Sequence, residues 1–425
     1  MTMKRMSWIA SALLLALPAC GPAQELEPCN IATQSCQEDI YYALVRMRGD
    51  GYDPFAGVPP INTVPIETYR MQLQEAAEAR QRAAMEKPCM LPDPDEPVPV
   101  VPWDFALQVL GLVEPKKPSC QASVDNQVSS VAAYYSSATR SVTVIDRGQE
   151  RDDFFDTGLL LHELTHALQD RELSGAFIDG TTDGTLAARA LTEGEATFYQ
   201  HLSHFEMNDD APEDFDWHEG YTNNLLGGRF FLGSENDKGE PNEKSPYFGV
   251  RWFIYPLGAR FLSDAWERGG NAAMRHAYAT QPRHIAQFMT PHDEEAEGVR
   301  AVLDPALACP VEPPGEGWER PGFDRFGALI VYAFFTASEI PDEVAWPLAA
   351  GWDDDLIYVF FEPEDEIVLV SWRIRLADEQ AAETALERLV LDERVRASVE
   401  GRDLVLISGN DADMTAEWQG TLVCR

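Results

Sequence analysis

The hydrophobic residues of the middle of the chain fall first into short β-rich runs and then into longer stretches. Residues 130–146 hold two runs rich in valine, tyrosine and threonine around the polar stretch "SSATR". Such a pattern predicts a β-hairpin. Residues 154–171 and 183–207 are long enough and apolar enough for two helices, with Asp183 as the N-cap of the second. We therefore expect a hairpin followed by two long helices.

Further helices are predicted on both sides of this region. Residues 65–87 are full of strong helix formers and begin with proline. Residues 251–270 predict a helix that stops at paired glycines, and residues 271–281 predict another. The intervening residues 211–250 are rich in glycine, asparagine and proline. They predict a long loop, and the proline-rich residues 87–102 predict an extended linker.

A smaller module is predicted at the end of the chain. Its pattern is a helix, two strands, a helix and a final strand, over residues 323–338, 356–362, 366–376, 378–391 and 403–409. The last four elements form a β-β-α-β unit. Together with the mostly helical region before it, this predicts an α+β fold.

Length and composition suggest several parts and exclude some partners. The chain has 425 residues, of which 45% are hydrophobic and 24% charged, so it can bury a sizeable core. Its formal net charge of −38 repels phosphates and anionic lipid headgroups, so nucleic acid is not an expected partner. We expect a signal segment, an N-terminal extension, a main domain and the C-terminal module, over residues 1–20, 21–120, 121–310 and 320–425.

The first twenty residues predict export. "MTMKR" is a basic start, "WIASALLLAL" an apolar run and "LPAC" a small-residue end. "Leu17-Pro-Ala-Cys20" resembles the lipobox of bacterial lipoproteins, although Pro18 departs from the usual small residue. Lipidation at Cys20 would place the protein in the bacterial cell envelope, on the outer membrane facing the periplasm or the exterior, with the lipid as its membrane contact. The alternative is a plain secretory signal that is cleaved nearby.

The cysteines agree with an exported chain. There are seven, so six remain once Cys20 is set apart, and an even number suggests disulfides. Neighbouring positions suggest the pairs Cys29–Cys36 and Cys89–Cys120, which leaves Cys309–Cys424. No Cys-x-x-Cys pair occurs, which argues against a cysteine zinc site.

The segment "LLLHELTHALQD", residues 159–170, carries the candidate chemistry. His162 and His166 are spaced i, i+4, so both imidazoles leave one face of a helix, and Glu163 follows the first. Two nitrogen ligands and a general base on one rigid element suit a zinc hydrolase. The alternative is a buried structural helix with two hydrogen-bonded histidines.

A catalytic zinc usually takes a third protein ligand. A histidine-completed site would need Gly at 169 and His at 172, but Gln169 and Glu172 stand there. The segment "LTEGEAT", residues 191–197, offers Glu193 or Glu195 on the next helix, and only one of two residues two apart can reach the metal.

The neighbours of the two glutamates favour the first of them. Those of Glu193 are small apart from one arginine, namely Arg189, Ala190, Ala196 and Thr197, whereas those of Glu195 are mostly bulky. A small face lets the second helix approach the first, so Glu193 is the predicted ligand. Glu195 would then stand behind the ligands, contact a substrate amine or be a solvated helix charge.

With these motifs the chain resembles the gluzincin metallopeptidases. It is most similar to a group of uncharacterised bacterial zinc peptidases that share "HELxHALQD" and "LxEGxAT". The motifs "AYYSSATRSVTVI", "YPLGARFLSDAWERGG" and "AAGWDDD" extend the likeness over roughly residues 125–375. The resemblance implies a zincin-like domain with one catalytic zinc ion and, independently of the helix neighbours, Glu193 as a ligand.

The motif also suggests roles around the metal. Zinc would polarise water and a substrate carbonyl, with Glu163 as the general base. Tyr255 is the first candidate to stabilise the oxyanion, with His276 and Tyr247 behind it, although a core aromatic is the alternative. Asp170 could orient an imidazole or cap the helix. The hairpin could pair with a peptide substrate as an added strand.

The predicted function is therefore zinc-dependent hydrolysis of peptide bonds in a peptide or protein substrate. One alternative is a non-catalytic envelope lipoprotein that keeps the fold to bind zinc. Glu163 argues against it, because a pure binding site needs no general base. Another alternative is a zinc hydrolase that acts on a non-peptide amide or ester.

Overall fold

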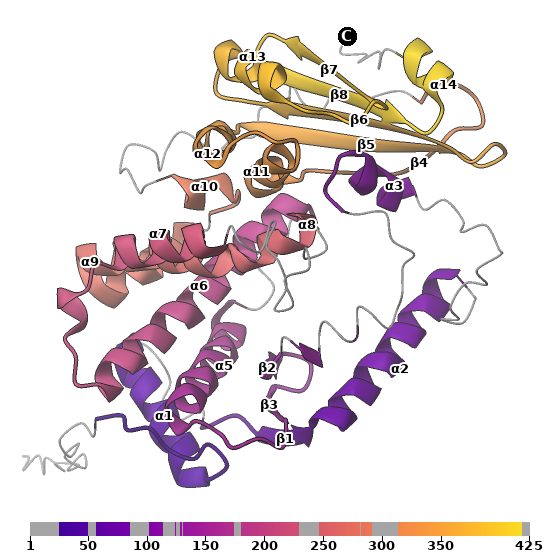
Figure 1. Ribbon diagram of the computed structural model, residues 1–425. Coiled ribbons are helices and arrows are strands. Elements are labelled where there is room, and N and C mark those ends of the chain that lie inside the picture. Colours follow the sequence, from indigo (N-terminus) through magenta and orange to yellow (C-terminus); the bar gives the residue numbers. More distant parts are fainter. Residues whose placement is uncertain are drawn as a thin grey trace, which may run out of the picture.

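The computed structural model shows a mostly helical α+β protein in which a helical region lies beside a C-terminal sheet (Figure 1). This agrees with the predicted fold class. The structure describes residues 25–49, 57–85, 102–113, 124, 128–129, 131–173, 180–228, 246–280, 282–290 and 313–418. The signal segment with Cys20, nearly all of the predicted linker 87–102, and Cys89, Cys120, Cys309 and Cys424 lie outside these residues.

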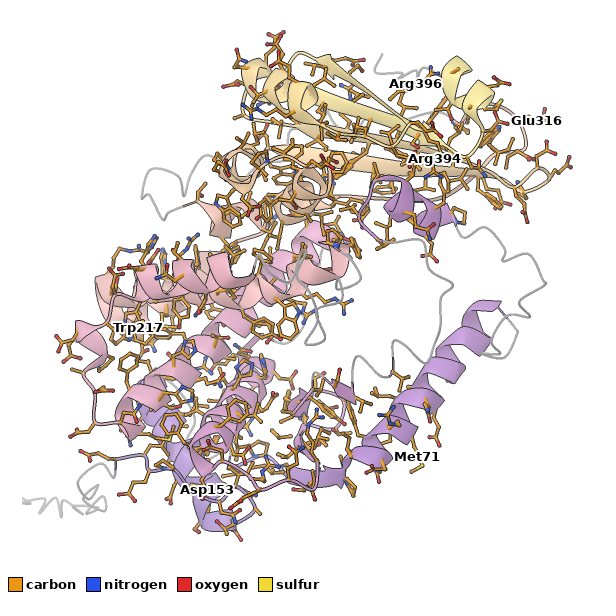
Figure 2. The ribbon with its side chains drawn as sticks, viewed as in Figure 1. Met71, Asp153, Trp217, Glu316, Arg394 and Arg396 are labelled. Carbon is orange, nitrogen blue, oxygen red and sulfur yellow. A yellow bond between two sulfur atoms is a disulfide. The ribbon has the colours of Figure 1, made fainter. Side chains whose placement is uncertain are left out.

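The helical region is built around one central helix, α6, which packs against α5 on one side and α9 on another. The main helices of the region are α1 (Gln34–Arg48), α5 (Asp153–Leu173), α6 (Thr182–Met207), α7 (Trp217–Gly228) and α9 (Ile254–Thr280). Figure 2 shows Trp217 among the side chains between α7 and its neighbours, where it packs against Phe198 and Phe205 of α6. These contacts hold α6 inside the apolar core.

The two long helices predicted around the metal motif are confirmed with small changes at their ends. Asp183 is not the N-cap of α6: Thr181 is, and its hydroxyl accepts a hydrogen bond from the Gly184 amide. The carboxylate of Asp183 instead accepts from the His284 ring and from the Ile285 amide. It therefore ties the start of α6 to the segment that follows α9.

The predicted hairpin is confirmed, but its sheet has a third strand. Strands β2 (Ala133–Ser136) and β3 (Ser141–Asp146) pair antiparallel, and β1 (Ile61–Pro65) adds to β3 in parallel. The order β1-β3-β2 leaves β2 at an edge, and β2 packs against α5. The predicted helix at 65–87 is α2 (Ile66–Met85).

The N-terminal extension contains a helix that the sequence analysis missed. Helix α1 packs against α5, and it starts where the Thr33 hydroxyl accepts from the Cys36 amide. The predicted disulfide Cys29–Cys36 is present at its start, with the sulfur atoms 2.08 Å apart. The apolar residues of α1 lie three and four apart, but glycine and proline on both sides obscured this signal.

The predicted loop at 211–250 is wrong over part of its length. It contains the short helix η2 (Pro212–Asp214), α7, α8 (Pro246–Gly249) and the start of η4 (Val250–Trp252). The predicted break at the paired glycines is confirmed. Gly269 and Gly270 leave the helical conformation and form a kink that divides α9 into two helical parts. Short helices such as α7 depend on tertiary contacts, for example those of the buried Trp217, so composition does not predict them.

The C-terminal sheet has five strands, so the predicted β-β-α-β order is incomplete. The predicted strands are β5 (Asp354–Glu362), β6 (Ile367–Arg375) and β8 (Asp403–Gly409), and the predicted helices are α11 (Gly327–Ala337) and α13 (Glu379–Arg388). The missed elements are β4 (Glu319–Asp324), β7 (Val395–Glu400), α12 (Asp342–Ala350) and α14 (Ala412–Glu417). The antiparallel order is β4-β5-β6-β8-β7, so both missed strands are edge strands.

The buried helix α11 connects the sheet to the helical region. Figure 1 shows α11 and α12 between the two, and the core continues through them from α6 to the inner face of the sheet. Helix α3 (Pro102–Val109), which comes from the N-terminal extension, packs against β5 and β6. In the described part of the chain, no helix is both long and apolar enough to cross a membrane.

Two glycines allow the closest helix contact near the metal motif. A methyl group on Gly258 of α9 would lie 1.6 Å from the Ala190 carbonyl oxygen of α6, and one on Gly194 would lie 2.2 Å from the Gly258 carbonyl carbon. Ala190 was predicted to allow α6 to approach α5, but it lies against α9. The backbones of α6 and α9 therefore touch, which sets the rotation of α6.

We predict that Gly258→Ala lowers the free energy of unfolding by about 2–3 kcal/mol, because its new methyl group meets backbone that cannot move aside. Urea denaturation measures this. The matched control is Gly220→Ala in α7, whose methyl group has the partly exposed Phe215 ring, a side chain and not backbone, as its nearest neighbour. Equal stability of the two variants would contradict the backbone contact.

Candidate metal centre

The two histidines of the motif point from α5 toward α6. Leu160, Leu161, Leu164 and Leu168 are buried and fix the rotation of α5 in the core. His162 and His166 lie one turn apart on the remaining face, with their Nε2 atoms 3.2 Å from each other. Both imidazoles are thus aimed at one point.

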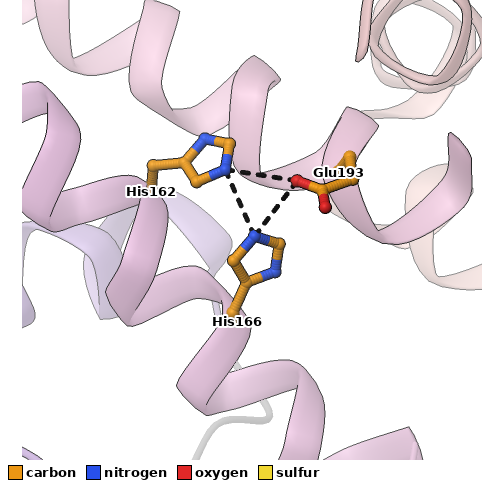
Figure 3. Close-up of side chains that lie close together, drawn as sticks. All are labelled: His162, His166 and Glu193. Carbon is orange, nitrogen blue, oxygen red and sulfur yellow. Dashed lines mark hydrogen bonds and ion pairs between the residues drawn. The ribbon is translucent and has the colours of Figure 1, made fainter. Parts of the chain in front are cut away.

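Glu193 of α6 completes a triangle with the two imidazoles, as Figure 3 shows. Its Oε2 atom lies 3.5 Å from Nε2 of His162 and 3.3 Å from Nε2 of His166. Ligands at about 2.0–2.2 Å from a tetrahedral zinc lie about 3.3–3.6 Å from one another. The donor atoms and their spacing therefore fit a zinc ion.

The three groups attract a positive charge to their centre. Burial by itself would lower the pKa of His166, but the hydrogen bond and the charge of Glu193 raise it to about 9. Burial would raise the pKa of Glu193, but hydrogen bonds from both histidines hold it far below its ordinary value. A proton and a metal cation compete for this site.

Glu163 and Tyr255 lie beside the triangle of His162, His166 and Glu193. Glu163 is buried beside the first histidine, and its charge acts on both His166 and Tyr255. The Tyr255 ring stacks 6.3 Å from that of His162, and its hydroxyl hydrogen bonds to Glu193. Burial, followed by the charge of Glu193, raises the pKa of Tyr255, so the hydroxyl keeps its proton.

The other two candidates for stabilising an oxyanion lie elsewhere. The ring of Tyr247 packs against Phe326, and its hydroxyl bonds to Thr182. The side chain of His276 is exposed on α9, after the glycine break. Tyr255 is therefore the candidate that the structure places against the triangle of His162, His166 and Glu193.

An exposed aromatic side chain adjoins the site. Trp252 is 47% exposed, and its ring lies 6.3 Å from that of Tyr255, which in turn stacks on His162. This row of rings leads from the surface to the candidate metal site. Arg189 is paired with Glu193 at 3.4 Å, with its long side chain on the solvent side.

Asp170 does not take the position predicted for it. Its carboxylate accepts a hydrogen bond from the Tyr135 hydroxyl at 2.9 Å, which joins the hairpin to α5. The imidazole of His166 is held by Gln169 instead, with Oε1 of the amide 2.8 Å from Nδ1. Gln169 and Asp170 both lie one turn after His166. Because the Asp170 carboxylate is bound by Tyr135, the side chain that contacts the imidazole is that of Gln169.

Glu195 lies behind the three candidate ligands and is not a solvated charge. It is 3% exposed, and its Oε2 accepts from Nε2 of Gln169 at 2.8 Å and from the Tyr278 hydroxyl. Its other oxygen pairs with Arg48 at 2.7 Å. Sequence reasoning missed Gln169, Arg48 and Tyr278. The i, i+3 spacing could have indicated Gln169, but no local pattern indicates the other two.

Comparison with known proteins finds distant relatives of one kind. The chain is 24% identical over 165 residues to extracellular metalloproteinase 5 of Trichophyton rubrum, and equally so to that of Arthroderma otae. The match covers 38% of this chain and about a quarter of each relative. No family model matches, and no solved structure matches. The similarity supports the coarse class that the motifs predict, a metallopeptidase.

We predict that zinc binding releases roughly one proton near pH 7.5, because the raised pKa keeps His166 protonated until a metal displaces the proton. The apparent zinc affinity should then rise about tenfold per pH unit up to about pH 9, where the imidazole becomes neutral. Calorimetric titrations in two buffers of different ionisation enthalpy count the protons. Equal heats in the two buffers would contradict the prediction.

Proposed function

We propose that this protein is a zinc-dependent peptidase of the glutamate-completed type. The observation that carries the proposal is the triangle of His162, His166 and Glu193, whose edges of 3.2, 3.3 and 3.5 Å are close to those of a tetrahedral zinc site. The buried Glu163 beside it supports hydrolysis over simple metal storage. The distant similarity to metalloproteinases agrees with this class.

The side chains around the triangle suit hydrolysis of an amide bond. Zinc, when bound by the three ligands, supplies Lewis-acid chemistry that activates water and an amide carbonyl. Glu163 accepts the proton of the attacking water and delivers it to the nitrogen of the leaving amine. Tyr255 keeps its hydroxyl proton and donates a hydrogen bond to the carbonyl oxygen as charge develops there.

The surroundings support a peptide as the substrate. The exposed ring of Trp252 and the half-buried ring of Tyr255 offer an apolar surface next to the candidate metal site. Strand β2 is at the edge of its sheet and is joined to α5 by Tyr135 and Asp170. An extended peptide could therefore pair with this strand. Cleavage of esters or other amides is tested with the same variants.

We predict that Glu163→Gln keeps stoichiometric zinc but lowers peptide cleavage by about 10²–10⁴-fold, because the proton acceptor is lost while all three ligands remain. Cleavage of a mixed peptide library, followed by mass spectrometry, measures this.

Tyr255→Phe should lower kcat about 10²–10³-fold with a smaller change in KM.

The matched control for these variants is Glu219→Gln, an exposed glutamate on α7 that should leave cleavage unchanged. Stoichiometric zinc with no cleavage that depends on Glu163 would instead favour the non-catalytic lipoprotein. Cleavage of ester or non-peptide amide substrates alone would redirect the proposal to the third alternative.

We also propose that the protein is exported and anchored in a bacterial envelope through a lipid on Cys20. The basic start, the apolar run and the lipobox-like "LPAC" support this. We predict that Cys20→Ala moves the protein from the membrane fraction to the soluble fraction of expressing cells. Metabolic labelling with a fatty acid should mark the unchanged chain and not the variant. Equal labelling of both would contradict lipidation at Cys20.

A further inference from the structure

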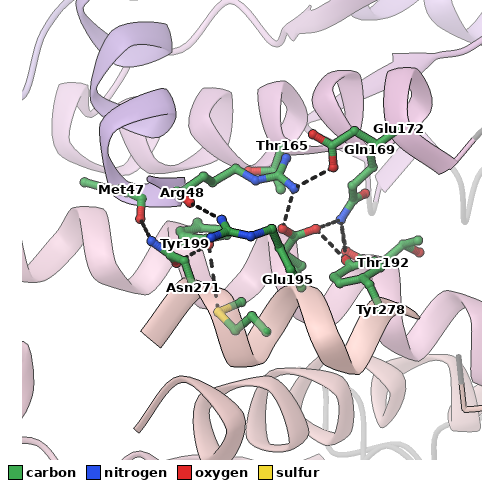
Figure 4. Close-up of polar contacts among 12 residues, drawn as sticks. Met47, Arg48, Thr165, Gln169, Glu172, Thr192, Glu195, Tyr199, Asn271 and Tyr278 are labelled. Atoms are coloured by element: carbon green, nitrogen blue, oxygen red, sulfur yellow. Dashed lines mark hydrogen bonds and ion pairs between the residues drawn. The ribbon is translucent and has the colours of Figure 1, made fainter. Parts of the chain in front are cut away.

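We infer that Arg48 of α1 is a positioning residue of the metal centre, which acts on His166 through Glu195 and Gln169. The inference rests on the metal site proposed above, but it concerns how the chain holds that site. Figure 4 shows the connected side chains, which come from α1, α5, α6 and α9. The four helices meet directly behind the metal ligands.

The first step is the orientation of the Gln169 amide. Its nitrogen lies 2.8 Å from the Thr192 carbonyl oxygen and 2.8 Å from Oε2 of Glu195, and both of these atoms only accept hydrogen bonds. A reversed amide would place its oxygen against two other oxygens. The nitrogen therefore faces Glu195 and Thr192, and Oε1 faces His166.

The second step is the tautomer of His166. Because Oε1 of Gln169 can only accept, the Nδ1 atom 2.8 Å away must carry the hydrogen. The lone pair of the neutral ring then lies on Nε2, which is the atom that faces Glu193 and His162. The amide thus presents the imidazole to a metal in the one form that can bind it.

The third step is the charge that holds the amide in place. Glu195 is 3% exposed, and such a carboxylate is costly to bury unless it is paired. Arg48 is 2% exposed and lies 2.7 Å from Oε1 of Glu195, which leaves Oε2 for Gln169 and Tyr278. Arg48 thereby keeps the carboxylate inside the protein as the acceptor that Gln169 requires.

The position of Arg48 is itself fixed by the end of α1. Asn271 of α9 donates to the Met47 carbonyl oxygen at 2.7 Å, and Arg275 donates to that of Arg48 at 3.2 Å. The Arg48 guanidinium lies over the Tyr199 ring, whose hydroxyl bonds to Asn271. Helix α1 therefore ends in a socket formed by α6 and α9.

A consequence concerns the N-terminal extension. Removal of residues up to Arg48 would leave Glu195 without its arginine inside the core. Arg48, at the end of α1, is therefore part of the working metal centre, so a cleavage that removed it would weaken zinc binding. The disulfide Cys29–Cys36 links the start of α1 to the residues just before it, and the Cys29 amide donates a hydrogen bond to the Thr157 hydroxyl of α5 at 3.1 Å.

The inference is tested by zinc affinity, measured in the whole chain by competition with a chelator. We expect Arg48→Met to weaken zinc binding about 10–100-fold, and Arg48→Lys to restore most of the loss. The matched control is Arg46→Met, two residues earlier on the same helix, which should change the affinity by less than about twofold.

A second variant separates positioning from folding. Arg48→Met combined with Glu195→Met replaces the buried ion pair by apolar side chains, which are often neutral for stability. We expect this double variant to unfold at a urea concentration near that of the wild type, yet to bind zinc at least about tenfold more weakly. The visible absorption bands of its cobalt-substituted form should shift, because the ligand geometry changes.

The outcomes discriminate clearly. A folded double variant with unchanged zinc affinity and unchanged cobalt bands would overturn the role of Arg48. A wild-type protein that binds zinc but cleaves no peptide would overturn the proposed function and leave this inference standing. A wild-type protein that takes up no zinc would overturn both.

Discussion

The site depends on how helix α6 is rotated between its two neighbours. Three consecutive residues, Glu193, Gly194 and Glu195, leave the helix about 100° apart. Glu193 faces the imidazoles of α5, Gly194 lies against the backbone of α9, and Glu195 faces the arginine of α1. Because no side chain fits between Gly194 and Gly258, α6 cannot turn without losing both carboxylates from their positions. Close backbone packing therefore determines the chemistry.

Buried charge is the second constraint. The chain carries a net charge of −38, and three glutamates, Glu163, Glu193 and Glu195, lie together inside it or nearly so. Such a group is stable only where cations compensate it. Arg48 compensates Glu195, and the space between Glu193 and the two histidines suits a metal ion. The hydrogen bond and the charge of Glu193 also raise the pKa of His166. The negative charge of the buried glutamates thus explains both the raised pKa of His166 and why the site suits a cation.

The predictions succeeded where a signal was local and long. The hairpin, α5, α6 and the strands β5, β6 and β8 all follow from runs of apolar residues. They failed for short elements stabilised mainly by distant partners. Strand β1 pairs with β3 across the sequence, and β4 and β7 are edge strands of the C-terminal sheet. Helix α7 begins at the buried Trp217, which packs against Phe198 and Phe205 of α6. Composition alone describes such segments as loops.

At the site, the sequence by itself indicated the candidate ligands on one helix and the most suitable candidate on the next. Spacing places His162 and His166 on one face, and the small neighbours of Glu193 favour it over Glu195. Only the tertiary structure decided that Gln169, and not Asp170, holds His166, and that α1 supplies the arginine behind it. The physical reason is that helix periodicity reports neighbours within a few residues, whereas the pairing of a buried charge depends on which distant helix fills the space beside it.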